Sequence, residues 1–243
     1  MSEKSPFEYQ ALAGSQERFW PGLFITFEGG DGVGKSTQIR RLYERLRERG
    51  CDVVLTREPG GSKGAEEIRK LLVEGEPGRW SAMTEALLMI ASRNDHLEKT
   101  ILPALRGGAV VLCDRFIDST MAYQGIAGDL GSERINGLHN LVIGDIVPDL
   151  TFVLTLSSEA GLARANARGQ QGQNGSSSED RFERKGRNFQ EDVHKAFAQL
   201  QTLYPDRCIG VDTSGDIEKT SDAILDVVMG RYSDAEFLTK RKS

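Results

Sequence analysis

Residues 29–36 of the chain, GGDGVGKS, constrain its fold more than any other segment. They match the pattern G-x-x-x-x-G-K-[ST] in full. They lie between an apolar run at 23–28 and a segment at 35–49 whose apolar residues recur at helical spacing. Glycines allow backbone N–H groups to curl around phosphate oxygens at the start of a helix. The segment therefore predicts a strand, a phosphate-binding loop and a helix that together bind ATP or GTP with Mg²⁺.

Within this loop, Lys35 is expected to reach the terminal phosphates and Ser36 to offer its hydroxyl group to Mg²⁺. The predicted ATP-binding residues are Gly29, Gly30, Asp31, Gly32, Val33, Gly34, Lys35, Ser36 and Thr37. The alternative, a glycine-rich turn that binds nothing, is disfavoured by the complete motif in its expected context. The loop alone does not distinguish a kinase from a GTPase or a motor ATPase, but the sequence lacks the N-K-x-D motif with which GTPases read guanine.

Four more short apolar runs follow, at 52–58, 109–114, 150–156 and 208–212, and helical patterns cover 83–105 and 216–231. Strands without polar alternation are typical of a parallel sheet that is covered on both faces. We therefore expect an α/β protein of the P-loop NTPase type. It would be a three-layer sandwich with a five-stranded parallel sheet, helices on both faces and a small mobile lid.

Composition limits the other classes. The longest apolar run has six residues, at 86–91, against about 20 for a membrane span. A net charge of −5 argues against a nucleic-acid partner, so we expect small-molecule partners and no membrane. Three scattered cysteines are typical of core residues in a reducing cytoplasm, with no metal site. We expect a flexible N-terminal extension at 1–21 and a single domain at 22–243, with its lid at about 161–187 around the Gly/Ser-rich stretch 169–178.

Four segments resemble the thymidylate kinase family: FEGGDGVGKST at 27–37, TREPGG at 56–61, DRFIDSTMAYQG at 114–125, and an arginine-rich lid at 164–187. The resemblance implies a nucleotide kinase domain that transfers the γ-phosphoryl group of ATP to dTMP, with Mg²⁺, and yields dTDP and ADP. It also implies a homodimer. Two alternatives stay open from the residues alone: another P-loop nucleotide or nucleoside kinase, and a nucleotide-dependent switch module.

The acceptor side of the site is expected at the carboxyl ends of two strands. Arg57 and Glu58 end the second strand, and Asp114 and Arg115 end the third, so both pairs should face the crevice of the phosphate loop. Arg57 and Arg115 are the predicted holders of the acceptor phosphate; the alternative for Arg115 is a structural ion pair with Asp114 or Glu58. Asp114 is predicted to hold Mg²⁺ through water. Asp31 is expected to contact the acceptor 3′-hydroxyl or to position the metal, unless it is a plain turn residue.

For the base, the resemblance implies that Arg93 contacts the thymine ring, the alternative being a solvated helix charge. Met89 stands where family members often have an aromatic residue that stacks on the base, which leaves the preference between dTMP and dUMP open. The remaining substrate-binding candidates are polar residues near the base and sugar, each with a core or surface role as the alternative: Ser119, Thr120, Tyr123 and Gln124. Among these, Tyr123 is expected to exclude a ribose 2′-hydroxyl.

The catalytic candidates are Lys35, Asp31 and three lid arginines. Some family members carry an arginine inside the phosphate loop, but Gly32 stands at that position here. Positive charge on the transferred phosphoryl group must then come from the lid. Arg164 and Arg168 share one helix face through their i, i+4 spacing, and Arg181 follows the Gly/Ser-rich stretch. The alternative for each is a solvated basic helix.

Overall fold

The computed structural model describes residues 20–144, 146–156, 181–233 and 235. Its centre is a five-stranded sheet in the order β2-β3-β1-β4-β5, in which each neighbouring pair is parallel. The strands are β1 (Leu23–Glu28), β2 (Val53–Arg57), β3 (Val110–Asp114), β4 (Leu150–Thr155) and β5 (Cys208–Asp212). These five strands confirm the five apolar runs, with bounds that differ by a residue or two.

Helices fill the connections between these strands. Their bounds are α1 (Lys35–Glu48), α2 (Lys63–Val73), α3 (Ala82–His96), α4 (Leu102–Arg106), α5 (Ile117–Thr120), α6 (Ser132–Ile143), α8 (Arg187–Leu203) and α9 (Ile217–Arg231), with single turns η1 (Leu97–Ile101), η2 (Met121–Ile126) and η3 (Glu183–Lys185). Side-chain caps begin three of the helices: Ser62 for α2, Ser81 for α3 and Asp216 for α9. No helix in the described ranges has the length and apolar character needed to span a membrane.

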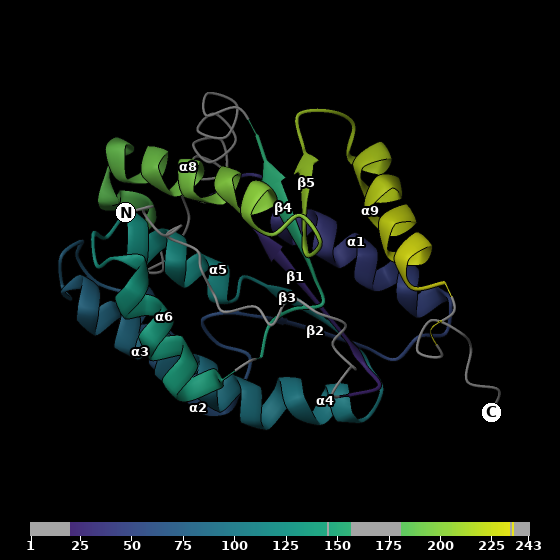
Figure 1. Cartoon of the computed structure of the whole chain (residues 1–243), viewed down its shortest axis with the longest axis horizontal. Helices are drawn as coiled ribbons and strands as arrows, with labels where there is room; N and C mark the ends of the chain where they lie inside the picture. The colour runs from purple at the N-terminus through teal and green to yellow at the C-terminus, as the bar shows by residue number, and fades with distance from the viewer. Residues whose placement is uncertain (1–19, 145, 157–180, 234, 236–243) are drawn as a thin grey trace, which may run out of the picture.

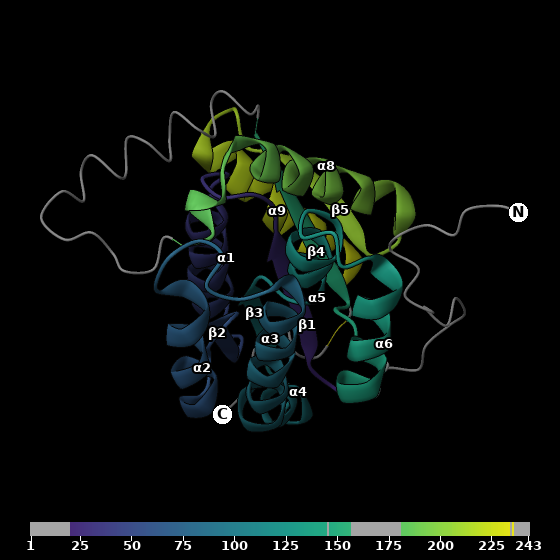
Figure 2. The same ribbon diagram turned by 90° about the vertical axis from the view of Figure 1, so that its left-hand side faces the viewer.

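The sheet separates two layers of helices (Figures 1 and 2). On one face, Leu23, Ile25 and Phe27 of β1 pack in a buried cluster with α1 and α9. On the other face, Phe24 packs with the segment that runs from η1 through α4. A third cluster joins Val153 of β4 to η2, α6 and α8. This three-layer arrangement confirms the expected fold. Strands that are buried on both faces need apolar side chains at every position, which explains the apolar runs in the sequence.

The sequence pattern at 83–105 predicts one helix, but the structure divides it. Helix α3 ends at His96, the π-helical turn η1 follows, and α4 begins at Leu102. Pro103 lies in the first turn of α4. Proline has no backbone N–H group and its ring clashes with the preceding turn, which breaks a regular i to i−4 ladder. The interruption therefore has a local cause in the sequence.

Several expectations fall outside the described residues. These are most of the N-terminal extension 1–21, the Gly/Ser-rich stretch 169–178, and Arg164 and Arg168. The division of the chain into extension, domain and lid therefore stays a prediction. The three cysteines are buried and unpaired, as expected for core residues.

Candidate active site

The phosphate loop joins β1 to α1 at the carboxyl edge of the sheet. Gly34, the residue before the helix, has φ 95°, a left-handed conformation that favours glycine. Lys35 Nζ donates hydrogen bonds to the carbonyl oxygens of Gly29 (3.0 Å) and Gly30 (2.7 Å). Burial, and then the nearby Arg115, lower the pKa of Lys35 to about 8. The ammonium group is thus held inside the loop, where it can exchange these carbonyls for phosphate oxygens.

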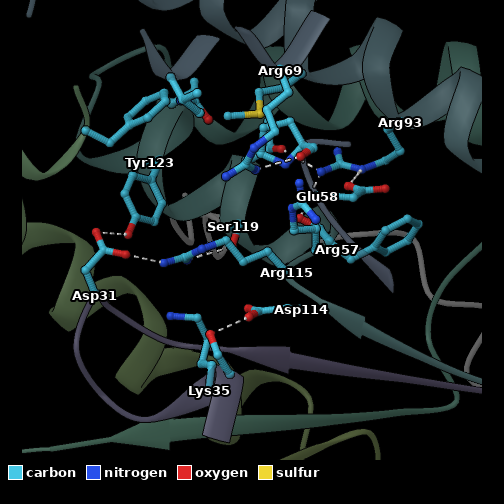
Figure 3. A pocket seen from close by; sticks show the side chains of 18 of the residues that line it. Asp31, Lys35, Arg57, Glu58, Arg69, Arg93, Asp114, Arg115, Ser119 and Tyr123 are labelled. Carbon is cyan, nitrogen blue, oxygen red and sulfur yellow. Dashed lines mark hydrogen bonds and ion pairs between the residues drawn. The ribbon is translucent and has the colours of Figure 1, made fainter. Parts of the chain in front are cut away.

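A cavity of about 340 Å³ opens beside this loop, at the carboxyl ends of β1, β2 and β3 (Figure 3). The register explains the position, because Asp114 lies opposite both Phe27 and Arg57. Sixteen of the predicted site residues line the cavity: Asp31, Gly32, Gly34, Lys35, Ser36, Thr37, Arg57, Glu58, Met89, Arg93, Asp114, Arg115, Ser119, Thr120, Tyr123 and Gln124. Gly29, Gly30 and Val33 belong to the loop without lining the cavity.

Asp31 connects the phosphate loop to two side chains of the cavity wall. Arg115 Nη2 donates to its Oδ1 at 2.6 Å, and the Tyr123 hydroxyl group donates to its Oδ2 at 3.1 Å (Figure 3). Burial alone would raise the pKa of Asp31, but Arg115 and Lys35 lower it below the usual value. Asp31 thus ties the turn to two side chains of the acceptor side, while its contact with the acceptor or the metal stays a prediction.

Arg115 reaches the loop from an unusual backbone conformation. Its φ is 71°, in the left-handed region that residues other than glycine seldom adopt, and its N–H donates to the carbonyl oxygen of Phe27. The guanidinium group also donates to the carbonyl oxygen of Gly29 and to Ser119 Oγ. The ion pair considered with Asp114 or Glu58 does not form in the structure; Asp31 is the partner.

Glu28, which the sequence analysis missed, holds the segment after β3 in place. Its two carboxylate oxygens accept hydrogen bonds from the backbone N–H of Phe116 (2.7 Å) and from Ser119 Oγ (2.6 Å). Burial, together with the charge of Asp118, raises the pKa of Glu28 to about 7. Only its position as the last residue of a buried strand, next to the loop, could have indicated this role.

Ser36 and Asp114 form the candidate metal-binding corner. Ser36 Oγ donates to Asp114 Oδ2 at 3.2 Å. The other oxygen, Oδ1, is buried and has no hydrogen-bond partner among the described residues. Hydroxyl and carboxylate oxygens are ligands that suit Mg²⁺, which keeps several of its waters. The two side chains therefore fit the metal expected with ATP.

Arg93 is buried, with only 1% of its surface exposed, so the alternative of a solvated helix charge is wrong. Four of its five N–H groups have partners: Nε donates to Glu58, Nη1 to His139, and Nη2 to Thr120 Oγ1 and the carbonyl oxygen of Phe116. Its guanidinium group also stacks over the Phe116 ring. Arg93 is thus fixed rigidly at the wall of the cavity, and its fifth N–H group has no partner among the described residues.

Comparisons with known proteins fit this geometry. A family model described as thymidylate kinase matches residues 27–224. The chain belongs to the thymidylate kinase family. The thymidylate kinase of Caulobacter vibrioides is 52% identical over 210 residues, which cover 86% of this chain and 97% of that protein. For that of Ruegeria pomeroyi, the identity is 51%, and the coverage is 86% and 95%.

A solved structure agrees. The crystal structure of thymidylate kinase from Ehrlichia chaffeensis is 32% identical, covers 85% of this chain and 98% of its own, and has a TM-score of 0.67. As a thymidylate kinase family member, the chain is a transferase that moves the γ-phosphoryl group of ATP to dTMP and yields dTDP and ADP. This supports the main interpretation over both alternatives, the other nucleotide kinases and the switch module.

Not every lid residue of this thymidylate kinase lies at the cavity. Arg181 is fully buried, and it donates to the carbonyl oxygens of Leu72 (2.8 Å) and Glu76 (3.1 Å) and to the carboxylate of Glu85. These contacts give Arg181 a structural role, while its catalytic role stays a prediction.

The sequence analysis missed further residues at the site. Arg69 and Phe182 line the cavity, and the ring of His194 lies against Gly30, where a Cβ atom would come within 2.6 Å of it. Glu85 does not line the cavity, but it accepts a hydrogen bond from Gln124, which does. Each comes from a helix or turn that has no recognisable motif, so only the fold brings it to the site.

Proposed function

We propose that dTMP binds in the cavity with its phosphate between Arg57 and Arg115, in line with the γ-phosphate of ATP on residues 29–37. The observation that carries this proposal is the side chain of Arg115. It lines the acceptor cavity and also contacts Asp31 and Gly29 of the phosphate loop. Arg57 is half exposed and, within the described part of the chain, forms a single salt bridge, with Glu66 at 3.1 Å. Both cations are therefore available to orient an acceptor phosphate.

We assign the base to the far wall of the cavity. Arg93 would donate its remaining N–H group to a ring carbonyl, and Gln124 and Thr120 would add polar contacts. Met89 would pack on the ring face in place of an aromatic side chain. Tyr123, held by Asp31, would close the sugar side where a 2′-hydroxyl would lie. Glu58 supports this wall, because it accepts from both Arg93 and His96.

ATP is the phosphoryl donor of the family, and Mg²⁺ is proposed as its companion ion. Ser36 would bind the ion directly and Asp114 through water, which fits the unpartnered carboxylate oxygen of Asp114. The ion would neutralise charge on the phosphates. Lys35 would contact the terminal phosphates, and Asp31 would hold Arg115 and face the sugar. Arg164, Arg168 and Arg181 are the proposed lid cations, of which the first two are favoured because Arg181 is engaged elsewhere.

We also propose a homodimer in the cytoplasm. Large apolar side chains are exposed on α3 and on its neighbour α6: Met83, Leu87, Leu141 and Val142. Leu141 is 82% exposed. The two helices pack against each other. Exposed apolar side chains on adjacent helices mark interaction surfaces, and a second copy of the chain would cover them.

Steady-state kinetics of Arg57→Ala test the acceptor assignment. A charged hydrogen bond contributes about 1.5–3 kcal/mol, so the KM for dTMP should rise about tenfold to a hundredfold, with a smaller change in the KM for ATP. Arg49→Ala, an exposed arginine at the end of α1, is the control and should leave both constants unchanged. An unchanged KM for dTMP in Arg57→Ala would contradict the assignment.

A further inference from the structure

Glu85 of α3 is a buried carboxylate that makes no contact with the phosphate loop. Its side chain is only 1% exposed, and its oxygens accept four hydrogen bonds. Arg181 donates to Oε1, Lys185 Nζ donates to Oε1 (2.9 Å) and Oε2 (2.7 Å), and Gln124 Nε2 donates to Oε2 (3.3 Å). Two of these donors are cations in the last part of the predicted lid, and the third lines the acceptor cavity.

The contact with Gln124 determines which way its amide group faces. A carboxylate only accepts hydrogen bonds, so the NH₂ group of Gln124 must face Glu85 and the carbonyl oxygen Oε1 must face away. Oε1 is buried and has no hydrogen-bond partner among the described residues. A buried carbonyl oxygen without a hydrogen-bond partner destabilises the folded protein, unless a ligand supplies a donor.

We propose that Glu85 is a positioning residue that sets base specificity by fixing Gln124 as a hydrogen-bond acceptor. The inference rests on the proposed function, in which the base lies beside Arg93 and Gln124. An acceptor next to the Arg93 donor complements a pyrimidine that carries N–H at position 3 and a carbonyl group at position 4, as in thymine and uracil. Cytosine presents the opposite pair, a lone pair at N3 and an amino group at position 4. Arg181 and Lys185 hold the carboxylate so that it cannot turn away.

The test is Glu85→Gln in the full chain, assayed with ATP and three acceptors: dTMP, dUMP and dCMP. The new amide can donate to Gln124 Oε1, which allows the Gln124 amide to flip and to present its NH₂ group to the base. The ratio of kcat/KM for dTMP over dCMP should fall at least tenfold. The ratio for dTMP over dUMP should stay within twofold, because both bases carry N–H at position 3.

Two further variants separate positioning from general damage. In a Gln124→Leu background, Glu85→Gln should leave the dTMP to dCMP ratio unchanged, since Glu85 acts through Gln124. Lys185→Gln removes another donor to the same carboxylate and should also leave that ratio unchanged. If Glu85→Gln alone does not fold, its combination with Lys185→Gln keeps the net charge of the cluster and should lower the ratio in the same way.

Three results would overturn the inference: an unchanged dTMP to dCMP ratio in Glu85→Gln, an equal fall of both ratios, or a further fall in the Gln124→Leu background. An unchanged dTMP to dCMP ratio in Gln124→Leu itself would instead remove the proposed function, because the base would then not lie against Gln124. The two failures are therefore distinguishable in one set of assays.

Discussion

At the residue scale, the site holds charges in pairs: Glu58 with Arg93 is buried, and Asp31 with Arg115 is partly exposed. Each pair joins segments that are far apart in the chain. A buried charge without a partner costs several kcal/mol, so the buried pair fixes the position of both of its side chains. Lys35 differs, because its described hydrogen bonds go to neutral carbonyl groups.

This difference gives Lys35 a measurable pH signature. Its pKa is about 8 in the folded protein, against an ordinary value of 10.5 for a lysine side chain. Between these values the unfolded chain binds more protons, so the free energy of unfolding contributed by Lys35 rises with pH. We expect the wild type to gain stability relative to Lys35→Met from pH 8 to 10.5, on the order of 2 kcal/mol. Urea denaturation of both proteins measures this difference.

The same variant also leads to a prediction about turnover. Lys35→Met should be folded at pH 7.5 and nearly inactive, because the ammonium group acts on phosphates and not in the core. A parallel pH dependence of stability in both proteins would contradict the burial account of Lys35. Near-normal turnover would contradict its phosphate role.

How well the sequence predicts the place of a residue depends on how far along the chain its partners lie. Motif residues such as Lys35 and Arg115 are specified locally, so their place at the cavity was predictable. The partner of Arg115 was not, because Asp31 lies 84 residues away. Glu85 and Arg181 are 96 residues apart. Their ion pair could be recognised only in the folded structure, where α2 and α3 lie against the segment 181–185.

At the element scale, the strands were easier to predict than the helices. Each strand is a short apolar run, and such runs are conspicuous in a sequence. The central strands β1, β3 and β4 are buried on both faces, whereas the edge strands β2 and β5 are partly exposed. Helix α2 buries only Ala65, Leu72 and Val73 among many charges, so its pattern is weak. Helix α8 follows a segment whose composition predicts a loop, and the sequence analysis assigned it no bounds.

The segment 181–185, just before α8, is anchored by its basic side chains. Arg181, Arg184 and Lys185 all bind the α2–α3 region, but Arg181 is fully buried whereas Arg184 is exposed. Breaking a buried pair costs about 3–5 kcal/mol, and an exposed pair contributes about 0–1 kcal/mol.

We therefore expect Arg181→Ala to lower the free energy of unfolding by about 3 kcal/mol or more and Arg184→Ala to change it little. By contrast, Arg164→Ala and Arg168→Ala should leave stability unchanged and lower kcat at least about tenfold, or roughly 1.4 kcal/mol. Urea denaturation and steady-state kinetics of the four variants measure both effects. The division of roles fails if Arg181→Ala is as stable as Arg184→Ala, or if both lid variants keep the wild-type kcat.

At the scale of the whole molecule, the exposed apolar side chains of α3 and α6 predict a dimer of 26.8 kDa chains. Leu87→Glu combined with Leu141→Glu places charges in that surface and should give monomers in sedimentation velocity. Ile217→Glu, at an apolar side chain of α9 that is as exposed as Leu87, is the control and should remain dimeric. A wild-type protein that sediments as a monomer would contradict this prediction.

The central claim is that one cavity brings ATP on the phosphate loop together with dTMP on Arg57 and Arg115. The most direct measurement is ATP-dependent ADP release from the full chain with dTMP, AMP, GMP and CMP as acceptors, with and without Mg²⁺. The account predicts that kcat/KM is highest for dTMP, that the rate requires Mg²⁺, and that Lys35→Met abolishes it. ADP release no faster with dTMP than with the other three nucleotides would contradict the account.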